Sequence, residues 1–247
     1  MNTFADSLLT ALQLVVSLDA SLWLVVGRSL AVSATACLIA GAFGLWLGAW
    51  LGTARFRGHE SVLTLLNTWL AVPSVVVGLV VYLLMSRTGP LGFLGWLFSF
   101  KAMVFAQAIL VLPVVTALVR QVVSDAERQH GEQLASLGAR PVLRSLLLAW
   151  DERYALLTVA ITAFGRAISE VGAVMIVGGN IDGFTRVMTT AIALETSKGD
   201  LPLALGLGLV LLAVMLLLNA LVSVLRRWRE RGGGVPLGHE ASAGWAA

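Results

Sequence analysis

Five long apolar stretches limit this chain to a fold that lies in a membrane. Crossing a bilayer as a helix takes about 20 mostly apolar residues, and each stretch is long enough. They cover roughly residues 24–52, 62–85, 102–123, 154–178 and 201–225. With 58% hydrophobic and 13% charged residues over 247 positions, the chain is too apolar for a soluble domain of this length. We therefore expect an all-α membrane protein with about five transmembrane helices.

Two prolines fall inside the predicted spans, at Pro73 and Pro113. Each removes one backbone donor, and neighbouring helices or water can satisfy the carbonyl that is freed. We expect a kink at both positions.

The two ends of the chain differ from its middle. A sixth span over residues 4–20 stays open, although Asp6 and Asp19 leave it short. The last residues are rich in Gly, Ala and Ser, and His239 among them is expected to be solvated. We divide the chain into an amphipathic N-terminal segment at 1–21, a transmembrane domain at 22–228 and a disordered tail at 229–247.

The basic residues predict the orientation, because Lys and Arg concentrate on the cytoplasmic side. Arginines gather after the first span, around the loop between the third and fourth spans, and after the fifth. They are Arg55 and Arg57; Arg120, Arg128, Arg140, Arg144 and Arg153; and Arg226, Arg227, Arg229 and Arg231. These regions alternate correctly to share one side. We predict an external N-terminus and a cytoplasmic C-terminus.

The largest cytoplasmic loop, residues 124–150, contains the segment "GEQLASLGARPVLRS". Ser124 followed by Glu127 fits a capping box that starts a helix. Gly138 permits the left-handed backbone that ends one helix, and Pro141 suits the first turn of the next. We predict two short helices that meet at a glycine elbow. Four side chains would form an apolar ridge that needs a partner surface: Leu134, Leu137, Val142 and Leu146.

This loop resembles the E-A-A…G loop of permease subunits in binding-protein-dependent ABC importers, which docks into a groove on the ATPase. The match lies at Glu132, Gln133, Leu134, Gly138 and Ala139. The resemblance implies a cytoplasmic coupling helix between spans three and four. The residues expected to couple to the ATPase are Glu132, Leu134, Leu137, Gly138, Ala139 and Arg140. An amphipathic helix lying on the membrane surface is the alternative.

A second resemblance covers residues 164–200. "GRAISEVGA" and "GGNIDGFT" are similar to elements of oxyanion importer permeases for molybdate, sulfate and tungstate, and most similar to the tungstate branch. With the hydropathy pattern, the resemblance extends from about residue 20 to 228. It implies the type I permease fold, a homodimer, two copies of an ATPase subunit, an extracytoplasmic oxyanion-binding protein and a place in the cell inner (plasma) membrane.

Tungstate is therefore the expected solute. The same architecture for molybdate, sulfate or another small solute stays open, as does a stand-alone channel. The chain has no phosphate-binding loop of the G-x-x-x-x-G-K-[ST] type, so ATP hydrolysis is expected on a partner chain and not here. We expect no enzyme activity, no cofactor, no metal site and no nucleic-acid partner. Cys37 is expected to be a small buried thiol.

Two charged residues lie inside the fourth span. Arg166 and Glu170 are four apart, which places them on one face of a helix. Charges in hydrocarbon are costly unless they are paired or face the bundle interior. We predict an ion pair that fixes this span against a neighbour. The alternative is that Arg166 also attracts the passing oxyanion while Glu170 prevents its trapping.

The loop after the fourth span contains Gly178, Gly179 and Asn180. We interpret them as a helix C-cap, with an anion-binding nest of backbone N–H groups as the alternative. Thr185, Arg186 and Lys198 follow on the outer side. They could contact the anion or the docked binding protein, and solvated loop charges are the simplest expectation.

Overall fold

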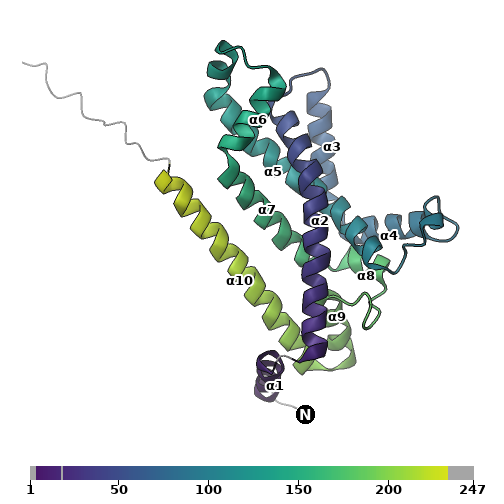
Figure 1. Cartoon of the computed structure of the whole chain (residues 1–247). Helices are drawn as coiled ribbons and strands as arrows, with labels where there is room; N and C mark the ends of the chain where they lie inside the picture. Colours follow the sequence, from purple (N-terminus) through teal and green to yellow (C-terminus); the bar gives the residue numbers. More distant parts are fainter. Residues whose placement is uncertain (1–3, 18, 233–247) are drawn as a thin grey trace, which may run out of the picture.

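The computed structural model describes residues 4–17 and 19–232, which are helical with no strand among them (Figure 1). The elements, in chain order, are α1 (Phe4–Val16), α2 (Ala20–Thr53), α3 (His59–Ala71), α4 (Ser74–Met85), the short 3-10 helix η1 (Gly92–Leu94), α5 (Phe100–Ser136), α6 (Pro141–Asp151), α7 (Arg153–Ile168), α8 (Gly172–Gly178), α9 (Met188–Lys198) and α10 (Leu201–Gly232).

Three helices, α2, α5 and α10, are each long and apolar enough to cross a membrane. Two further apolar units are bent pairs: α3 and α4 meet at 94°, and α7 and α8 meet at 57°. Counted as one span each, these pairs bring the total to the five predicted stretches. The prediction of an all-α membrane protein is confirmed.

Proline explains the first bend. Pro73 lies between α3 and α4, and Val72 before it is extended, with ψ 128°. A residue that precedes proline is disfavoured in the helical conformation, because the ring crowds its backbone. The chain therefore turns sharply here, which is a larger change than the predicted kink. Pro113, by contrast, stays inside the continuous helix α5.

The connections between helices gather at two ends of the molecule (Figure 1). The upper end carries the α2–α3 turn, the α5–α6 connection and the start of α7. The lower end carries α1, the start of α2, α9 and the start of α10, and α10 rises from there. The connections that bear the arginines at 55–57 and 140–153 thus share the upper end.

The N-terminal helix α1 has 13 residues and lies across the lower end, against α10 (Figure 1). At about 1.5 Å per residue it measures about 20 Å, which is shorter than a span. The described part of residues 4–20 therefore contains no helix long enough for a sixth crossing. The next helix starts at Asp19, whose carboxylate accepts the N–H groups of Ser21 and Leu22. The hydroxyl of Ser21 and these N–H groups lower the pKa of Asp19.

The first four residues of the predicted disordered tail, 229–247, belong to α10. Residues 229–232 continue α10, because no helix-breaking signal precedes the glycines at 232–234. The remainder of the tail, 233–247 with His239, lies outside the described residues.

Glycines bring α2 and α5 close together. A Cβ on Gly44 would lie 2.8 Å from Val115 Cγ1, and one on Gly48 would lie 2.7 Å from Thr116 O. Small residues at such spacing let helix backbones approach in a membrane. Cys37, predicted to be buried, is half-buried beside this contact.

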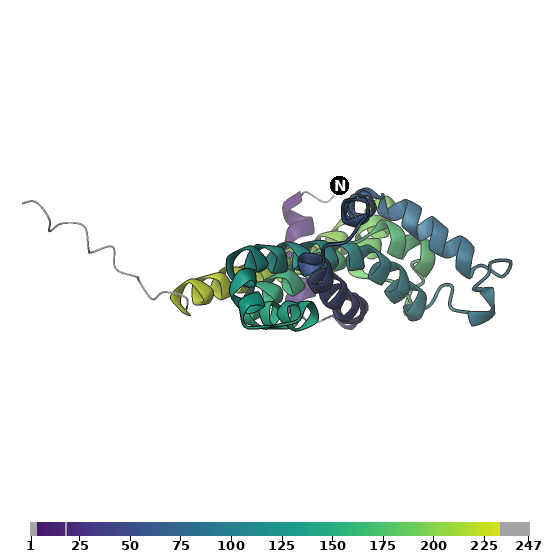
Figure 2. The same ribbon diagram turned by 90° about the horizontal axis from the view of Figure 1, so that it is seen from above.

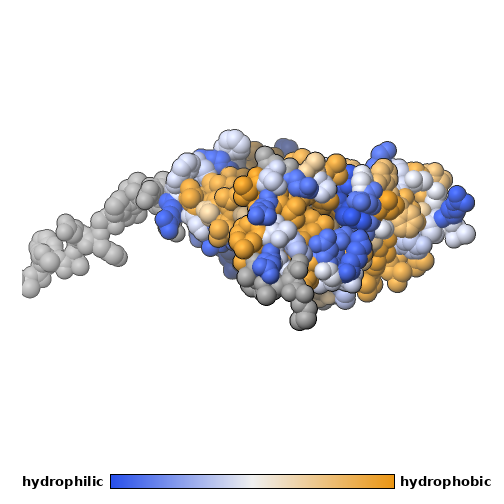
Figure 3. All heavy atoms as spheres, turned by 90° about the horizontal axis from the view of Figure 1, so that it is seen from below, coloured by the Kyte–Doolittle hydropathy of each residue, from blue (hydrophilic) through white to orange (hydrophobic). Residues whose placement is uncertain are grey.

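Seen from above, the helices form a flat layer rather than a closed bundle (Figure 2). Large apolar side chains consequently remain exposed along α2 and α10: Leu38, Phe43, Trp46, Leu212, Leu216 and Leu217. In a membrane protein such faces meet lipid or another transmembrane helix. The lower end instead shows hydrophilic residues among hydrophobic ones (Figure 3), as expected of a surface that reaches beyond the hydrocarbon.

Candidate functional site

The turn between α5 and α6 is a rigid elbow centred on Gly138. Gly138 has φ +78°, its N–H donates to Ala135 O at 2.9 Å, and the Ala139 N–H donates to Leu134 O at 3.0 Å. This pair of bonds is the Schellman arrangement, which satisfies the last carbonyls of a helix and favours glycine. Pro141 then opens α6. The predicted glycine elbow is present.

The first arm of the elbow differs from the prediction. It is no separate short helix, because α5 runs without interruption from the span to Ser136. Ser124 lies inside this helix and does not cap it, so the capping-box interpretation of Ser124 and Glu127 is wrong. Continuous backbone hydrogen bonding outweighed a local sequence signal that is worth only about 1 kcal/mol.

An ion pair braces the elbow. Arg144 Nη1 on α6 lies 3.3 Å from Glu127 Oε1 on α5, and both side chains are mostly buried. Leu148 on α6 is buried in the same core as Val123 on α5. Because both polar and apolar contacts join the two helices, α6 is held against the end of the α5 span.

The outer surface of the elbow is apolar. Leu137 is 83% exposed, and Val142 and Leu146 are 66% and 60% exposed. Leu134 differs from the predicted ridge, because it is half-buried against the core of α5 and α6. Glu132 and Arg140 lie beside the ridge, and neither has an ion pair within residues 4–17 and 19–232. The elbow therefore presents three apolar side chains with charges at the edge.

The second predicted site lies where α7 gives way to α8. Arg166 Nη1 is 3.4 Å from Glu170 Oε2, so the two side chains do pair. They do not share one helix, however, because α7 ends at Ile168 and Glu170 lies in the break. The Glu170 side chain is 5% exposed and that of Arg166 is 57% exposed. The carboxylate is thus buried, while the guanidinium reaches the surface of the chain.

The Glu170 side chain and side chains from two other helices hold this break. Glu170 Oε1 accepts the Ala173 N–H at 3.2 Å, which satisfies a donor at the start of α8. Thr189 Oγ1 donates to Glu170 O at 2.7 Å, and the Gln107 amide donates to Ala167 O. Carbonyls freed by the break therefore find donors on α9 and α5, which ties the break to both helices.

The Gly178–Gly179–Asn180 segment is a helix cap, as predicted. Gly179 has φ +70° and donates to Met175 O at 3.0 Å, and Asn180 follows at φ +50°. The alternative anion nest is not formed, because the Gly179 and Ile181 N–H groups already donate within the chain. Ile181 donates to Thr185 Oγ1, and that hydroxyl donates to Gly178 O.

The charged residues of the outer loop form ion pairs with one another, whereas the sequence suggested solvated charges. Arg186 is 16% exposed and pairs with Asp182 at 3.1 Å and with Glu195 at 3.7 Å. The half-exposed Lys198 also pairs with Glu195, at 3.0 Å. Thr185 is buried. The loop therefore folds its charges into an internal network.

Sequence reasoning missed two residues of α2 that hold this loop. Arg28 Nη2 donates to Gly183 O at 2.7 Å, and Ser29 Oγ accepts the Met188 N–H at 2.6 Å. The available signal was the presence of arginine inside an apolar stretch, which calls for a specific partner. The same signal applies to Gln107 on α5.

Comparison with known proteins identifies close relatives. The chain is 41% identical over 222 residues to the tungstate uptake system permease protein TupB of Peptoclostridium acidaminophilum, covering 90% of this chain and 97% of the relative. A probable anion ABC transporter permease protein of Haloferax volcanii is 40% identical over 211 residues (83% and 90%). The Campylobacter jejuni TupB is 39% identical over 173 residues (70% and 72%). No family model matches the chain.

Proposed function

The chain belongs to the permease subunits of ABC transporters, and from this membership we propose that it forms the membrane pathway of a tungstate importer. As such a subunit, it is a transport component of the inner membrane that crosses the bilayer several times, and it is not an enzyme. Tungstate is supported by two of the relatives, which carry that solute in their names at 41% and 39% identity.

An ABC permease works with an ATPase subunit and, in uptake, with a solute-binding protein. We propose two copies of the ATPase and a homodimer of this chain, with the binding protein on the outer side. The exposed apolar faces of α2 and α10 support a second transmembrane copy, because Trp46 and Leu216 are each more than two thirds exposed.

The elbow between α5 and α6 carries the coupling proposal. Its three exposed apolar side chains have no covering element in the described chain, while the Glu127–Arg144 pair fixes them to the α5 span. A force applied to this surface would move α5, and a separate ATPase is the component that must apply it. Leu137 and Val142 would provide apolar anchoring, with Glu132, Ala139 and Arg140 setting the register.

We propose that the upper end in Figure 1 faces the cytoplasm, with the N-terminus outside and the C-terminus inside. The arginine-rich connections support this orientation. In a Cys37→Ala background, cysteines placed at Ser136 and at the exposed Ser197 test it. An impermeant thiol reagent added outside intact cells should label position 197 only, and labelling at both positions would overturn the orientation.

We also propose the domain division at 1–21 and 22–228, since α1 lies apart from the spans. Arg166 is proposed as a structural partner of Glu170 whose half-exposed guanidinium also attracts the anion. Thr185 and Arg186 are proposed to shape the outer loop that receives the binding protein.

The substrate is tested by uptake. Cells that express this permease with its ATPase and binding protein should accumulate tungstate, and a large excess of sulfate should leave that uptake unchanged. Binding of tungstate, molybdate and sulfate to the purified binding protein distinguishes the alternatives. Uptake of sulfate but not tungstate would overturn the substrate while leaving the ABC permease assignment intact.

A further inference from the structure

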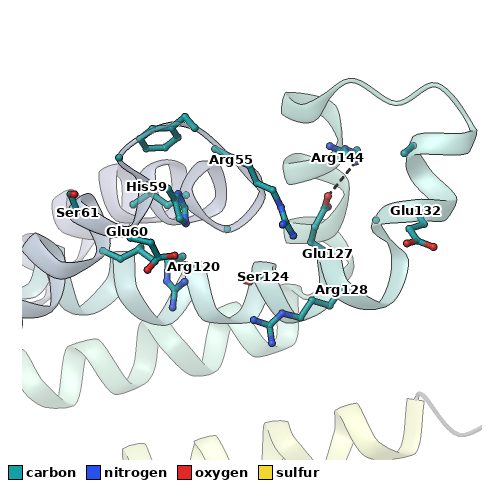
Figure 4. A pocket seen from close by; sticks show the side chains of 18 residues that line it. Arg55, His59, Glu60, Ser61, Arg120, Ser124, Glu127, Arg128, Glu132 and Arg144 are labelled. Carbon is teal, nitrogen blue, oxygen red and sulfur yellow. Dashed lines mark ion pairs between the residues drawn. The ribbon is translucent and has the colours of Figure 1, made fainter.

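A cleft of about 820 Å³ opens at the upper end, beside the elbow (Figure 4). Its walls are the end of α2, the α2–α3 turn, the start of α3, the last turns of α5 and one residue of α6. The elbow residues Leu137, Val142 and Leu146 do not line it. The cleft therefore adjoins the apolar ridge that we assign to the ATPase and shares Glu132 at its edge, but the apolar side chains of the ridge lie outside it.

Four arginines and three glutamates line this cleft, which leaves a small excess of positive charge. The charged residues that line it are Arg55, Arg120, Arg128, Arg144, Glu60, Glu127 and Glu132. Arg144 and Glu127 neutralise each other, and the two other glutamates are exposed, as are Arg55 and Arg128. Three arginines are left without a carboxylate partner within residues 4–17 and 19–232: Arg55, Arg120 and Arg128.

The spacing along α5 directs two of these arginines to one place. Arg120, Ser124 and Arg128 are successive i, i+4 positions, so they lie in a row on one helix face. In Figure 4, Arg55 reaches down from the α2–α3 turn, and Arg128 extends beside Ser124. Arginines from two separate segments thus line the same cleft as the Ser124 hydroxyl.

Unfilled hydrogen-bonding capacity lies in the same cleft. His59 Nδ1 and Arg144 Nε are both shielded from solvent and have no partner in the described chain. Both residues line the cleft. An arginine Nε–H can only donate, and an imidazole nitrogen can donate or accept, so the hydrogen-bonding capacity of both atoms stays unfilled in the wall of the cleft. Glu127 Oε2 is also unpartnered, and it belongs to the residue that Arg144 neutralises.

We propose that this cleft binds a tetrahedral oxyanion with phosphate-like chemistry, held chiefly by Arg55, Arg120 and Arg128. Arginine forks match the paired oxygens of such an anion, and the Ser124 hydroxyl adds a neutral donor. A free oxyanion and the phosphate of an anionic lipid headgroup present the same chemistry at this end of the spans. The site does not depend on which solute the permease carries.

The test uses the full-length chain in nanodiscs of phosphatidylcholine, with radiolabelled inorganic phosphate and tungstate as separate probes in equilibrium dialysis. Arg55→Gln and Arg128→Gln should each weaken binding about tenfold, as expected when one charged hydrogen-bonding partner is lost. The double variant should bind both probes about a hundredfold more weakly than the parent. The matched control is Arg57→Gln, because Arg57 is exposed, two positions from Arg55, and does not line the cleft.

Nanodiscs that contain phosphatidylglycerol distinguish the two sources. If the lipid is the ligand, it should compete with phosphate and be retained by the parent protein, but not by the double variant, in mass spectra. Equal probe binding by the parent and the double variant would overturn the proposal. So would the absence of binding of phosphate, tungstate and lipid by the parent. If the double variant binds the probes and the lipid as the parent does but no longer co-purifies with the ATPase, the arginines contact a protein partner, and the proposal is overturned.

Discussion

The elbow at 137–142 and the outer loop at 179–200 contain the same type of backbone turn but direct their side chains in opposite ways. Gly138 and Gly199 both follow a helix with positive φ, at +78° and +84°, and both belong to a Schellman pair of hydrogen bonds. The elbow then turns apolar side chains outward. The outer loop turns its charges inward, where Glu195 is 7% exposed between Arg186 and Lys198.

The outer loop is therefore a surface whose interactions are satisfied within the chain, whereas the elbow is a surface that needs a partner. The outer loop satisfies its own charges and is tied to α2 through Arg28 and Ser29. The elbow is fixed to the span, yet leaves Leu137 and Val142 without a cover in the described chain. Substitutions in the outer loop should therefore reduce stability first, whereas substitutions in the elbow should reduce assembly first.

The largest loss of stability is expected at Glu195. Its replacement by alanine leaves the mostly buried Arg186 with only the exposed Asp182, and should lower the free energy of unfolding by about 3 to 5 kcal/mol. Lys198→Met is the control, because Glu195 then keeps Arg186 as its partner and loss of the half-exposed Lys198 costs less than about 1 kcal/mol. Thermal unfolding of the purified chain in detergent measures both. Equal melting temperatures for the two variants would contradict an internal charge network.

The break between α7 and α8 should respond next. Arg166→Met leaves the buried Glu170 carboxylate without its cation, which should cost about 3 kcal/mol. Glu170→Gln should cost less, about 1 to 2 kcal/mol, because the amide oxygen can still accept the Ala173 N–H. The double variant should recover stability relative to Arg166→Met. Chemical denaturation checks this order, and a double variant no more stable than Arg166→Met would rule out an energetically important ion pair.

A matched pair of glycine substitutions sharpens the comparison directly. Gly138→Val and Gly199→Val each force a β-branched residue into a left-handed backbone, at a cost of about 1 to 2 kcal/mol. A Cβ at either position meets no atom within 4 Å, so the strain resides in the backbone alone. Both variants should reach the membrane at normal levels, as quantified by immunoblotting of membrane fractions.

Only Gly138→Val should reduce ATPase co-purification and uptake, since only that turn orients the apolar ridge. A similar loss in both variants would show that general destabilisation, and not the elbow, limits assembly.

Local signals explain which features the sequence could predict. The five apolar stretches, the turn at Gly138 and the cap at Gly179 each depend on neighbouring residues, and the structure contains them. Ser124 misled because a capping pattern inside a long helix has no free end to cap. The assignment of Leu134 to the ridge failed because the direction of its side chain depends on packing against the core, which neighbouring residues do not reveal.

Long-range contacts lay beyond the sequence. The partner of Arg28 is Gly183, which is 155 positions away, and Arg186 finds Glu195 only after α9 folds back. The charge of Arg28 can be read from the sequence, but its partner can be identified only once α2 is packed against the outer loop. The basic cleft likewise depends on bringing Arg55 beside the α5 row.

Photo-crosslinking at the elbow tests the central claim most directly. A photoreactive phenylalanine analogue at Leu137 should capture the ATPase subunit in membranes that contain the assembled transporter. The same analogue at Phe93 is the control, because that side chain is equally exposed, at 82% against 83%, but lies in the 86–99 connection at the opposite end of the α5 span. We expect the crosslinked ATPase band from position 137 and not from position 93. An ATPase band from position 93 with none from position 137 would contradict the assignment of the elbow as the coupling surface.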